Sequence, residues 1–381
     1  MLFKTCSHLL FMKSWLTLMI FLVLFVMIAT LLLQEAPETI AEEKPERIKM
    51  ATMWLEDRTE ESVRSIVRQM KEAGANSIAI GVHDYGVIYF QTDALNITVI
   101  DLAPAIIDEA REQDLKTFIW TDTINFPELL ESNPDWEFVT CFHGGRYHYP
   151  SNCGWHQRLS PFNPGIDDFV REYYHDLAQL DIDGIQFQDD LFLAEGEDFS
   201  DAAQYAFLDY YGSPPNPRNR EDLDRMQHLK IMRITELTKI AMDSAKEVNP
   251  DLVFVFDVLA EPERENMLNW WSIDISALRE AGVDYFGIMS YHPQVMQELR
   301  VDLEGSMDYL NGVFESISSQ VGKYRTIYRL WATTFDWDHG PLPQGELDYV
   351  IIRMLEADAY HIGYVPHYSS ILEYSPFLEI E

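Results

Sequence analysis

Short apolar runs alternate with amphipathic stretches along the chain from Ile48 onward. Each apolar run is too short for a helix and is rich in Ile, Val, Phe or Tyr, as the buried strands of parallel sheets are. The predicted strands are Lys49–Trp54, Ser77–Val82, Lys116–Trp120, Gly184–Phe187, Leu252–Val258, Tyr285–Met289, Thr326–Trp331 and His361–Val365. The predicted helices are Thr59–Ala73, Leu102–Gln113, Asp167–Leu180, Leu223–Val248, Ile273–Ala281, Leu303–Val321 and Glu346–Ala357. This alternation predicts an α/β fold.

Two architectures share the alternation, a (β/α)8 barrel of the TIM type and a doubly wound open sheet. Acidic, histidine and aromatic residues follow nearly every predicted strand, which favours the barrel because the loops after its strands converge on one face. Two connecting segments are long, Thr121–Pro164 and Leu191–Asn219, and long loops in compact domains are often functional. We therefore expect one barrel with its site at the mouth formed by these loops.

The residues before Ile48 predict a membrane anchor and a stalk. Trp15–Leu33 has no charged residue and is long enough to cross a bilayer. Lys4 and Lys13 precede this run and acidic residues follow it, so the positive-inside rule puts the N-terminus in the cytoplasm and the rest outside. A cleaved signal peptide is the competing interpretation. The expected organisation is an anchor in residues 1–34, an acidic stalk in residues 35–47 and a barrel in residues 48–381.

Composition narrows the possible partners. Aromatic residues make up 13% of the chain and apolar residues 47%, which is ample material for a core. The formal net charge of -35 argues against nucleic acid as a partner, because phosphate binding needs clustered Lys and Arg. No G-x-S-x-G elbow, P-loop or G-x-G-x-x-G is present, so nothing indicates a serine hydrolase or a nucleotide-dependent enzyme.

Cysteine and histidine residues gather in the first long loop. Cys141 and Cys153 would face an oxidising compartment, where they form either a disulfide or two separate thiols. With the histidines nearby they look superficially like a zinc set, but their spacing matches no known zinc motif. We expect neither a metal nor another cofactor.

The segment DGIQFQDD carries the sharpest chemical signal. A buried strand ends in two adjacent acids, Asp189 and Asp190, and strand neighbours point to opposite sides. One acid is therefore expected to face the barrel axis while the other supports it. Glycoside hydrolysis needs one carboxylic acid to protonate the leaving oxygen and a second group to attack or to activate water. Glu195 and Asp198 are candidates for that second group, although Asp198 equally suits the start of a helix.

The other residues expected at the mouth are acidic or aromatic, as in sugar sites, where carboxylates bind hydroxyl groups and flat rings stack on pyranose faces. Metal binding by the histidines is the weaker alternative, since none pairs at a recognised spacing. Trp331 is assigned to the core, and Trp337 is the expected stacking residue. The expected substrate-binding residues are His83, Asp84, Asp122, Asp257, Tyr291, Trp337, His367 and Tyr368.

Three segments resemble a known family, namely RLSPFNP from Arg158 to Pro164, DLAQLDIDGIQFQDD from Asp176 to Asp190, and EGED from Glu195 to Asp198. They look like the C-terminal glycoside-hydrolase domain of PgaB-type proteins, which process poly-β-1,6-N-acetylglucosamine, a biofilm exopolysaccharide. The resemblance covers most of residues 48–376. It implies a (β/α) barrel in which one unit can be degenerate, and it adds Arg158 to the expected substrate-binding residues.

What the resemblance implies is internal cleavage of partly deacetylated poly-β-1,6-N-acetylglucosamine, with Asp189 or Asp190 as acid/base. The second group would be Glu195, Asp198 or the acetamido group of the substrate itself. Gln188 stands where the family has His. This difference supports an alternative, a catalytically silent sugar-binding barrel that assists export of the polymer. A hydrolase acting on another glycan is a third possibility, and no deacetylase activity is expected.

Overall fold

The computed structural model describes residues 44–84, 86–138, 140–143, 146–148, 158–194, 196–260, 271–332 and 340–366, together with Leu372 and Phe377. The chain divides into two units, Met1–Glu46 and Arg47–Glu381. All the elements described below belong to the second unit.

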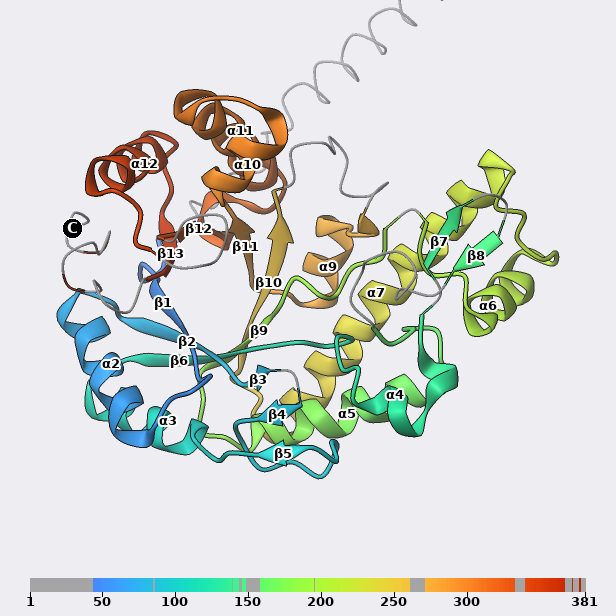
Figure 1. The fold of residues 1–381 in the computed structure, drawn as a ribbon, viewed down its shortest axis with the longest axis horizontal. Coiled ribbons are helices and arrows are strands. Elements are labelled where there is room, and N and C mark those ends of the chain that lie inside the picture. The colour runs from blue at the N-terminus through green and yellow to red at the C-terminus, as the bar shows by residue number, and fades with distance from the viewer. Residues whose placement is uncertain are drawn as a thin grey trace, which may run out of the picture. The chain divides into compact units, whose positions relative to one another are not determined.

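Eight parallel strands form a closed barrel in the order β1-β13-β12-β11-β10-β9-β6-β2 (Figure 1). The ring closes where β1 pairs with β13, with Lys49 beside Ile362. This closure confirms the predicted barrel over the open sheet, and all eight predicted strands take part in it. The strands are β1 (Lys49–Trp54), β2 (Ser77–Gly81), β6 (Lys116–Thr121), β9 (Gly184–Phe187), β10 (Val253–Leu259), β11 (Tyr285–Met289), β12 (Thr326–Trp331) and β13 (His361–Val365).

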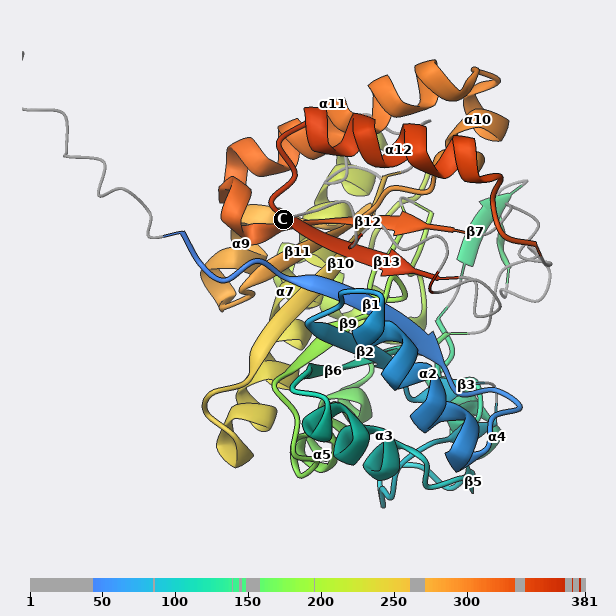
Figure 2. The ribbon, with the colours of Figure 1, turned by 90° about the vertical axis from the view of Figure 1, so that its left-hand side faces the viewer.

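The predicted helices form on the outside of the barrel, and Figure 2 shows α11 and α12 beside β12 and β13. Polar caps fix several starting points, because a side-chain oxygen there accepts a backbone N–H that has no partner in the helix. Thr59 caps the first helix, Asp274 caps α9 and Asp302 caps α11. The seven are α2 (Glu60–Glu72), α3 (Ala103–Glu112), α5 (Pro164–Ala178), α7 (Arg220–Val248), α9 (Ile275–Ala281), α11 (Leu303–Val321) and α12 (Gln344–Glu356).

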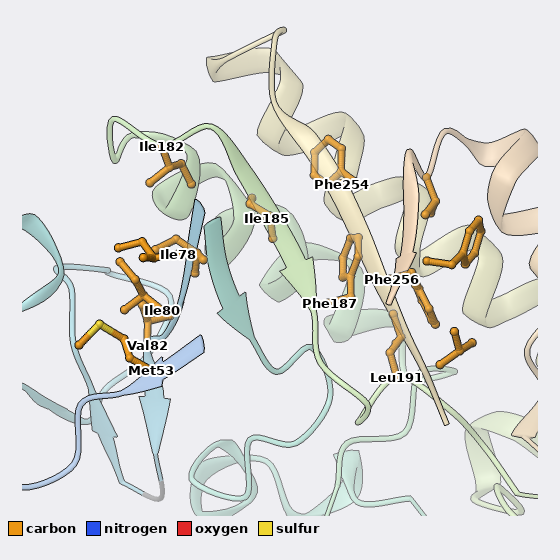
Figure 3. Packing of buried hydrophobic residues seen from close by; sticks show 14 of the residues in the cluster. Met53, Ile78, Ile80, Val82, Ile182, Ile185, Phe187, Leu191, Phe254 and Phe256 are labelled. Carbon is orange, nitrogen blue, oxygen red and sulfur yellow. The ribbon is translucent and has the colours of Figure 1, made fainter. Parts of the chain in front are cut away.

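Alternate residues of each strand separate two apolar clusters. In β10, Phe254 and Phe256 point outward to the helices, and Figure 3 shows them with Phe187 of β9. Val255, between them, belongs to a smaller cluster inside the barrel. Burying a side chain such as Phe stabilises the fold by about 1.5–3 kcal/mol, which explains why these strands have near-continuous apolar runs. The same alternation turns Asp257 toward the axis.

Short elements interrupt the segments predicted as loops. The long loop after β6 contains α4 (Leu129–Ser132) and a hairpin of β7 (Thr140–His143) and β8 (Arg146–His148), and the loop after β9 contains α6 (Asp201–Tyr211). The chain after β2 forms a small sheet of β3 (His83–Asp84), β4 (Val87–Ile88) and β5 (Thr98–Val99). Helix α10 (His292–Leu299) begins directly after β11. Two 3-10 turns, Pro134–Trp136 and Lys323–Arg325, complete the described elements.

Within the described residues, no helix combines the length and the apolar character that crossing a bilayer requires. The long helix α7 illustrates the point, because charged residues recur along its 29 positions. The predicted anchor, Trp15–Leu33, lies outside the described residues.

Candidate active site

The strand β9 ends at Phe187, and the chain turns at the acid pair. Before the turn, the Gln188 N–H still donates to the carbonyl of Thr121 at 3.0 Å, which keeps the chain beside β6. The turn interrupts the strict alternation of strand side chains, so Asp189 and Asp190 enter different surroundings. Strand alternation is expected to direct one acid to the axis and the other to a supporting position. In the structure, the loop contacts of each acid determine where its side chain lies.

Asp190 is buried and holds two loops together. Its Oδ2 accepts backbone N–H groups from Thr123, Ile124 and Asn125 at 2.8, 2.6 and 2.8 Å. Burial and the charge of Asp122 raise the pKa of Asp190, and the three donors counteract that increase. One oxygen is therefore fully occupied in joining the loop after β6 to the loop after β9, a supporting role.

Asp189 is only half-buried, and among the described residues no other side chain donates a hydrogen bond to it. Burial and the neighbouring carboxylates of Asp257 and Asp122 raise the pKa of Asp189 to about 6, and the Arg329 cation opposes them. A carboxyl group in this range keeps a fraction of its population protonated near neutral pH, as a general acid must. Of the two acids, Asp189 is thus the more exposed residue.

His83 lies between two carboxylates on the other side of the mouth. Its Nδ1 is 2.8 Å from Oδ2 of Asp122, and its Nε2 is 3.6 Å from Oε1 of Glu128. Burial alone would lower the pKa of His83, but the hydrogen bond to Asp122 and the nearby carboxylate of Glu128 raise it to about 9. His83 is therefore positively charged at neutral pH, and it orients Asp122. Sequence reasoning did not identify Glu128.

A cavity of about 410 Å³ opens beside this group. It is lined by Trp54, Leu55, Glu56, Arg58, Gly81, His83, Asp84, Tyr89, Asp122, Asn125 and Gln188. Three of the expected substrate-binding residues meet here, namely His83, Asp84 and Asp122. The lining combines carboxylates, two amides and aromatic rings, which is the chemistry of a sugar pocket.

Aromatic rings from β1, β6 and β12 meet near the end of β1. The Trp54 ring centre lies 5.3 Å from that of Trp120 and also 5.3 Å from that of Trp331. The row continues to Tyr291, whose ring centre is 4.8 Å from that of Trp331. Sequence reasoning missed Trp54, because KMATMW reads as a core strand. Its position as the last residue of β1 was the signal, since strand ends lie at the mouth.

Asp257 lies deeper, on the barrel axis, and is 1% exposed. Its carboxylate accepts hydrogen bonds from Gln186 Nε2 at 2.8 and 2.9 Å and from Trp120 Nε1 at 3.1 Å, and it forms an ion pair with Arg329. Both oxygens are thus engaged by the protein, so this placement does not favour the sugar contact expected for Asp257. Arg329 was missed, because in TIYRLW it reads as an isolated charge within a strand.

Arg158 is buried and bonds to the protein on two sides. Its Nη1 donates to the carbonyls of Asp190 and Phe192, both at 3.0 Å, and its Nη2 donates to Glu197 Oε2 at 2.9 Å. These contacts fix the loop that carries the acid pair. They favour a supporting part for Arg158 and not the expected contact with substrate.

Asp198 is fully buried below the start of α6. Its carboxylate accepts the hydroxyl of Ser160, the hydroxyl of Ser200 at 3.0 Å and the Ser200 N–H at 2.7 Å. Ser200 in turn caps α6 by accepting the Ala203 N–H. Of the two roles open for Asp198, this geometry favours support of the helix start over a role as the second catalytic group.

Some of the residues expected in the site lie outside the described part of the chain, namely Glu195, Trp337, His367, Tyr368 and the loop that carries Cys153. The side chain of Cys141 is also outside them. In the part of the chain that is described, no three His, Cys, Asp or Glu side chains are grouped to hold a metal ion.

The sequence model of a family described as hypothetical glycosyl hydrolase family 13 matches residues 87–365. A search of the curated proteins gives no match. Among solved structures, the fold is similar to that of the PgaB (BpsB) glycoside hydrolase domain from Bordetella bronchiseptica. That match has 19% identity and a TM-score of 0.70, and it covers 84% of this chain and 94% of that domain.

The barrel is also similar to two other solved structures. The β-galactosidase from the Antarctic haloarchaeon Halorubrum lacusprofundi matches with 13% identity and a TM-score of 0.63, over 83% of this chain and 52% of that one. The catalytic domain of the β-amylase from Paenibacillus polymyxa matches with 11% identity and a TM-score of 0.57, over 83% and 91%. The resemblance drawn from the three sequence motifs is confirmed. The chain therefore belongs to hypothetical glycosyl hydrolase family 13 and is a glycoside hydrolase.

Proposed function

We propose that this glycoside hydrolase cleaves an amino-sugar exopolysaccharide internally, with partly deacetylated poly-β-1,6-N-acetylglucosamine as the substrate. The sequence resemblance to the PgaB-type domain suggests this polymer. The observation that carries the proposal is Asp189, a half-buried carboxyl group whose pKa is raised to about 6 at the mouth of the barrel.

Asp189 acts as the general acid and protonates the leaving glycosidic oxygen. Its raised pKa keeps a useful fraction of the carboxyl group protonated near neutral pH. The second group is either Glu195 or the acetamido group of the substrate, since Asp198 is enclosed by Ser160 and Ser200. A fully deacetylated polymer separates these options. It stays uncleaved if the acetamido group acts, and it is cleaved if Glu195 does.

The charges of the cavity support an amino sugar. The carboxylates of Glu56, Asp84 and Asp122 outnumber the cations of Arg58 and His83 in its lining. Free amino groups on the polymer carry positive charge, so both this lining and the strongly acidic chain attract them. The ring of Trp54, which is partly exposed, offers a stacking surface for a pyranose ring.

The direct test is hydrolysis of the polymer by Asp189→Asn protein. We expect a loss of at least a hundredfold in rate, because general acid catalysis contributes about that much or more. Asp209→Asn is the matched control, as Asp209 is an exposed carboxylate on α6. Chain length of the products is measured by mass spectrometry. Full activity of the Asp189→Asn variant would refute the proposal.

A second candidate function is a silent sugar-binding barrel that guides polymer to an export machine. Gln188 favours it, because this amide lines the cavity where the PgaB-type motif has His. The purified protein would then retain the polymer without shortening it. Cleavage by the unaltered protein excludes this function, and gain of cleavage by Gln188→His would favour it.

The proposed location is the outer side of a membrane, with residues 1–34 as the anchor and residues 35–47 as a stalk. The uncharged run Trp15–Leu33 supports this organisation. Membrane fractionation followed by protease treatment of intact cells tests it. Protein that sediments with membranes and is digested from outside supports the anchor. Release into the medium with a shortened N-terminus supports a cleaved signal peptide instead.

A further inference from the structure

We propose that Asp257 and Arg329 are positioning residues that act through Asp189, as a buried ion pair at the barrel axis, and that neither contacts the sugar. This inference rests on the proposed role of Asp189 as the general acid. It replaces the substrate contact expected for Asp257, and it assigns a function to Arg329, which no sequence motif had indicated.

The ion pair is built into the strands themselves. Asp257 belongs to β10, where Phe256 pairs with Phe187 of β9, so Asp257 stands at the level just before the turn that carries Asp189. Arg329 comes from β12 and is also 1% exposed. The rigid barrel strands therefore hold both charges, and neither can follow a moving loop.

Two glycines provide the space for the Arg329 side chain. Arg329 pairs with Gly363 of β13, and a Cβ at that position would lie 2.8 Å from Arg329 Cγ. A Cβ at Gly287 of β11 would overlap Asp257 Oδ1 and lie 3.0 Å from Arg329 Cδ. The strands on both sides of β12 thus lack side chains where the arginine crosses the barrel interior, which gives the ion pair one defined geometry.

Only part of the Arg329 guanidinium group is hydrogen-bonded within the described residues. Nη1 pairs with Asp257, whereas Nε and Nη2 are buried with no hydrogen-bond partner among the described residues. A buried ion pair adds little to stability, because desolvating both charges offsets their attraction, and unpaired donors add a further cost. The ion pair therefore contributes little to the stability of the fold, which is consistent with a role in the site.

The titratable and charged groups that face Asp189 come from four elements. Asp257 of β10 and Asp122 after β6 repel its negative form, and Arg329 of β12 attracts it. Tyr291, after β11, is the fourth neighbour, and burial raises its pKa so that it stays neutral. Removing the charge of Asp257 must therefore lower the pKa of Asp189, and removing the charge of Arg329 must raise it. If the ion pair had only a structural role, the two changes would not shift the pKa of Asp189 in opposite directions.

The experiment compares the pH dependence of kcat/KM for polymer cleavage by Asp257→Asn and Arg329→Gln proteins. Activity falls at high pH as the general acid loses its proton. We expect this alkaline limb to move to lower pH in Asp257→Asn and to higher pH in Arg329→Gln, each by about one pH unit. Arg329→Lys keeps the charge and restores the position of the limb. In the Asp257→Asn/Arg329→Gln double variant both residues are neutral. This variant should move the alkaline limb less than either single change.

A second measurement covers variants with too little activity for a profile. The carboxyl carbon signal of Asp189, assigned by its absence in Asp189→Asn, is titrated by NMR and must show the same opposite displacements. If the titration midpoint of Asp189 moves in the same direction in both variants, or does not move, the inference is overturned. If Asp189→Asn cleaves normally, the proposed function fails instead, so the two failures are distinct.

Discussion

Oδ2 of Asp190 lies 2.6 Å from the backbone nitrogen of Ile124. The hydrogen bond joins the loop after β9 to the loop after β6, and these two strands are neighbours in the barrel. Asp189 and Asp122 follow the same two strands, so the Asp190 carboxylate fixes how these two acids lie relative to each other. The pair thus divides into a buried residue that joins the two loops and a more exposed residue, Asp189, which we propose as the general acid.

Replacing Asp190 by Ala should destabilise the protein. The backbone N–H groups of Thr123, Ile124 and Asn125 would lose their acceptor inside the protein. Leaving buried donors unsatisfied costs about 1–3 kcal/mol each unless water replaces the acceptor. The free energy of unfolding, measured with urea, should fall by at least that amount. Asp209→Ala on α6 is the control, and equal stability of the two variants would contradict the clamp role.

Replacing Asp189 by Asn should stabilise the protein at neutral pH while it abolishes cleavage. Burial and nearby carboxylates raise the pKa of Asp189 to about 6, so the folded state holds its proton more tightly than the unfolded state. This contribution to stability is present below pH 4 and is lost as pH rises through 6. The free energy of unfolding of the variant should exceed that of the unaltered protein by on the order of 1–3 kcal/mol at pH 7. At pH 3.5 the two values should be equal. An equal difference at both pH values would contradict this account.

The stability of the protein should decline between pH 6.5 and 9 because of His83. Its pKa in the folded state is raised to about 9, against an ordinary value of 6.5. The ion pairs with Asp122 and Glu128 are thus complete below pH 6.5 and are lost as pH rises through 9. The decline should amount to at most about 3 kcal/mol, and His83→Gln should abolish it. His175→Gln, at a more exposed position on α5, should keep the decline.

Trp54→Ala should weaken substrate binding. The Trp54 ring lines the cavity and touches the rings of Trp120 and Trp331. Loss of a stacking surface of this kind costs about 0.5–1.5 kcal/mol, which raises KM about two- to tenfold. Trp54→Phe keeps a flat ring and should recover most of the affinity. Tyr210→Ala removes an aromatic side chain that is 54% exposed on α6 and serves as the control. An unchanged KM for Trp54→Ala would exclude this ring from the sugar site.

The short elements escaped sequence prediction for a common reason. Strands such as Val87–Ile88 have two residues and α4 has four, so they contain no complete period of apolar residues. Helix α10 was also missed, because it has only eight residues and is separated from β11 by only two, where a loop was expected. In the structure, His292 is fully buried and lies 2.9 Å from Glu346.

The sequence by itself determined the barrel and the position of its mouth. Strand periodicity is a local property, and the eight predicted strands agree with those of the structure to within about a residue at each end. Because parallel strands direct their ends to one face, the same pattern was enough to identify the acid pair, His83 and Asp122 as residues of that face.

Only the tertiary structure decided what each of these side chains contacts. The Asp190 bond to Ile124 spans 66 positions and the Asp257 pair with Arg329 spans 72. Burial and the distance between charges depend on such contacts, and no local pattern in the sequence encodes them. The enclosure of Asp190, Asp198 and Arg158 and the charges around the site therefore follow from how the closed barrel brings distant strands together. On these contacts we base the proposal of Asp189 as the general acid.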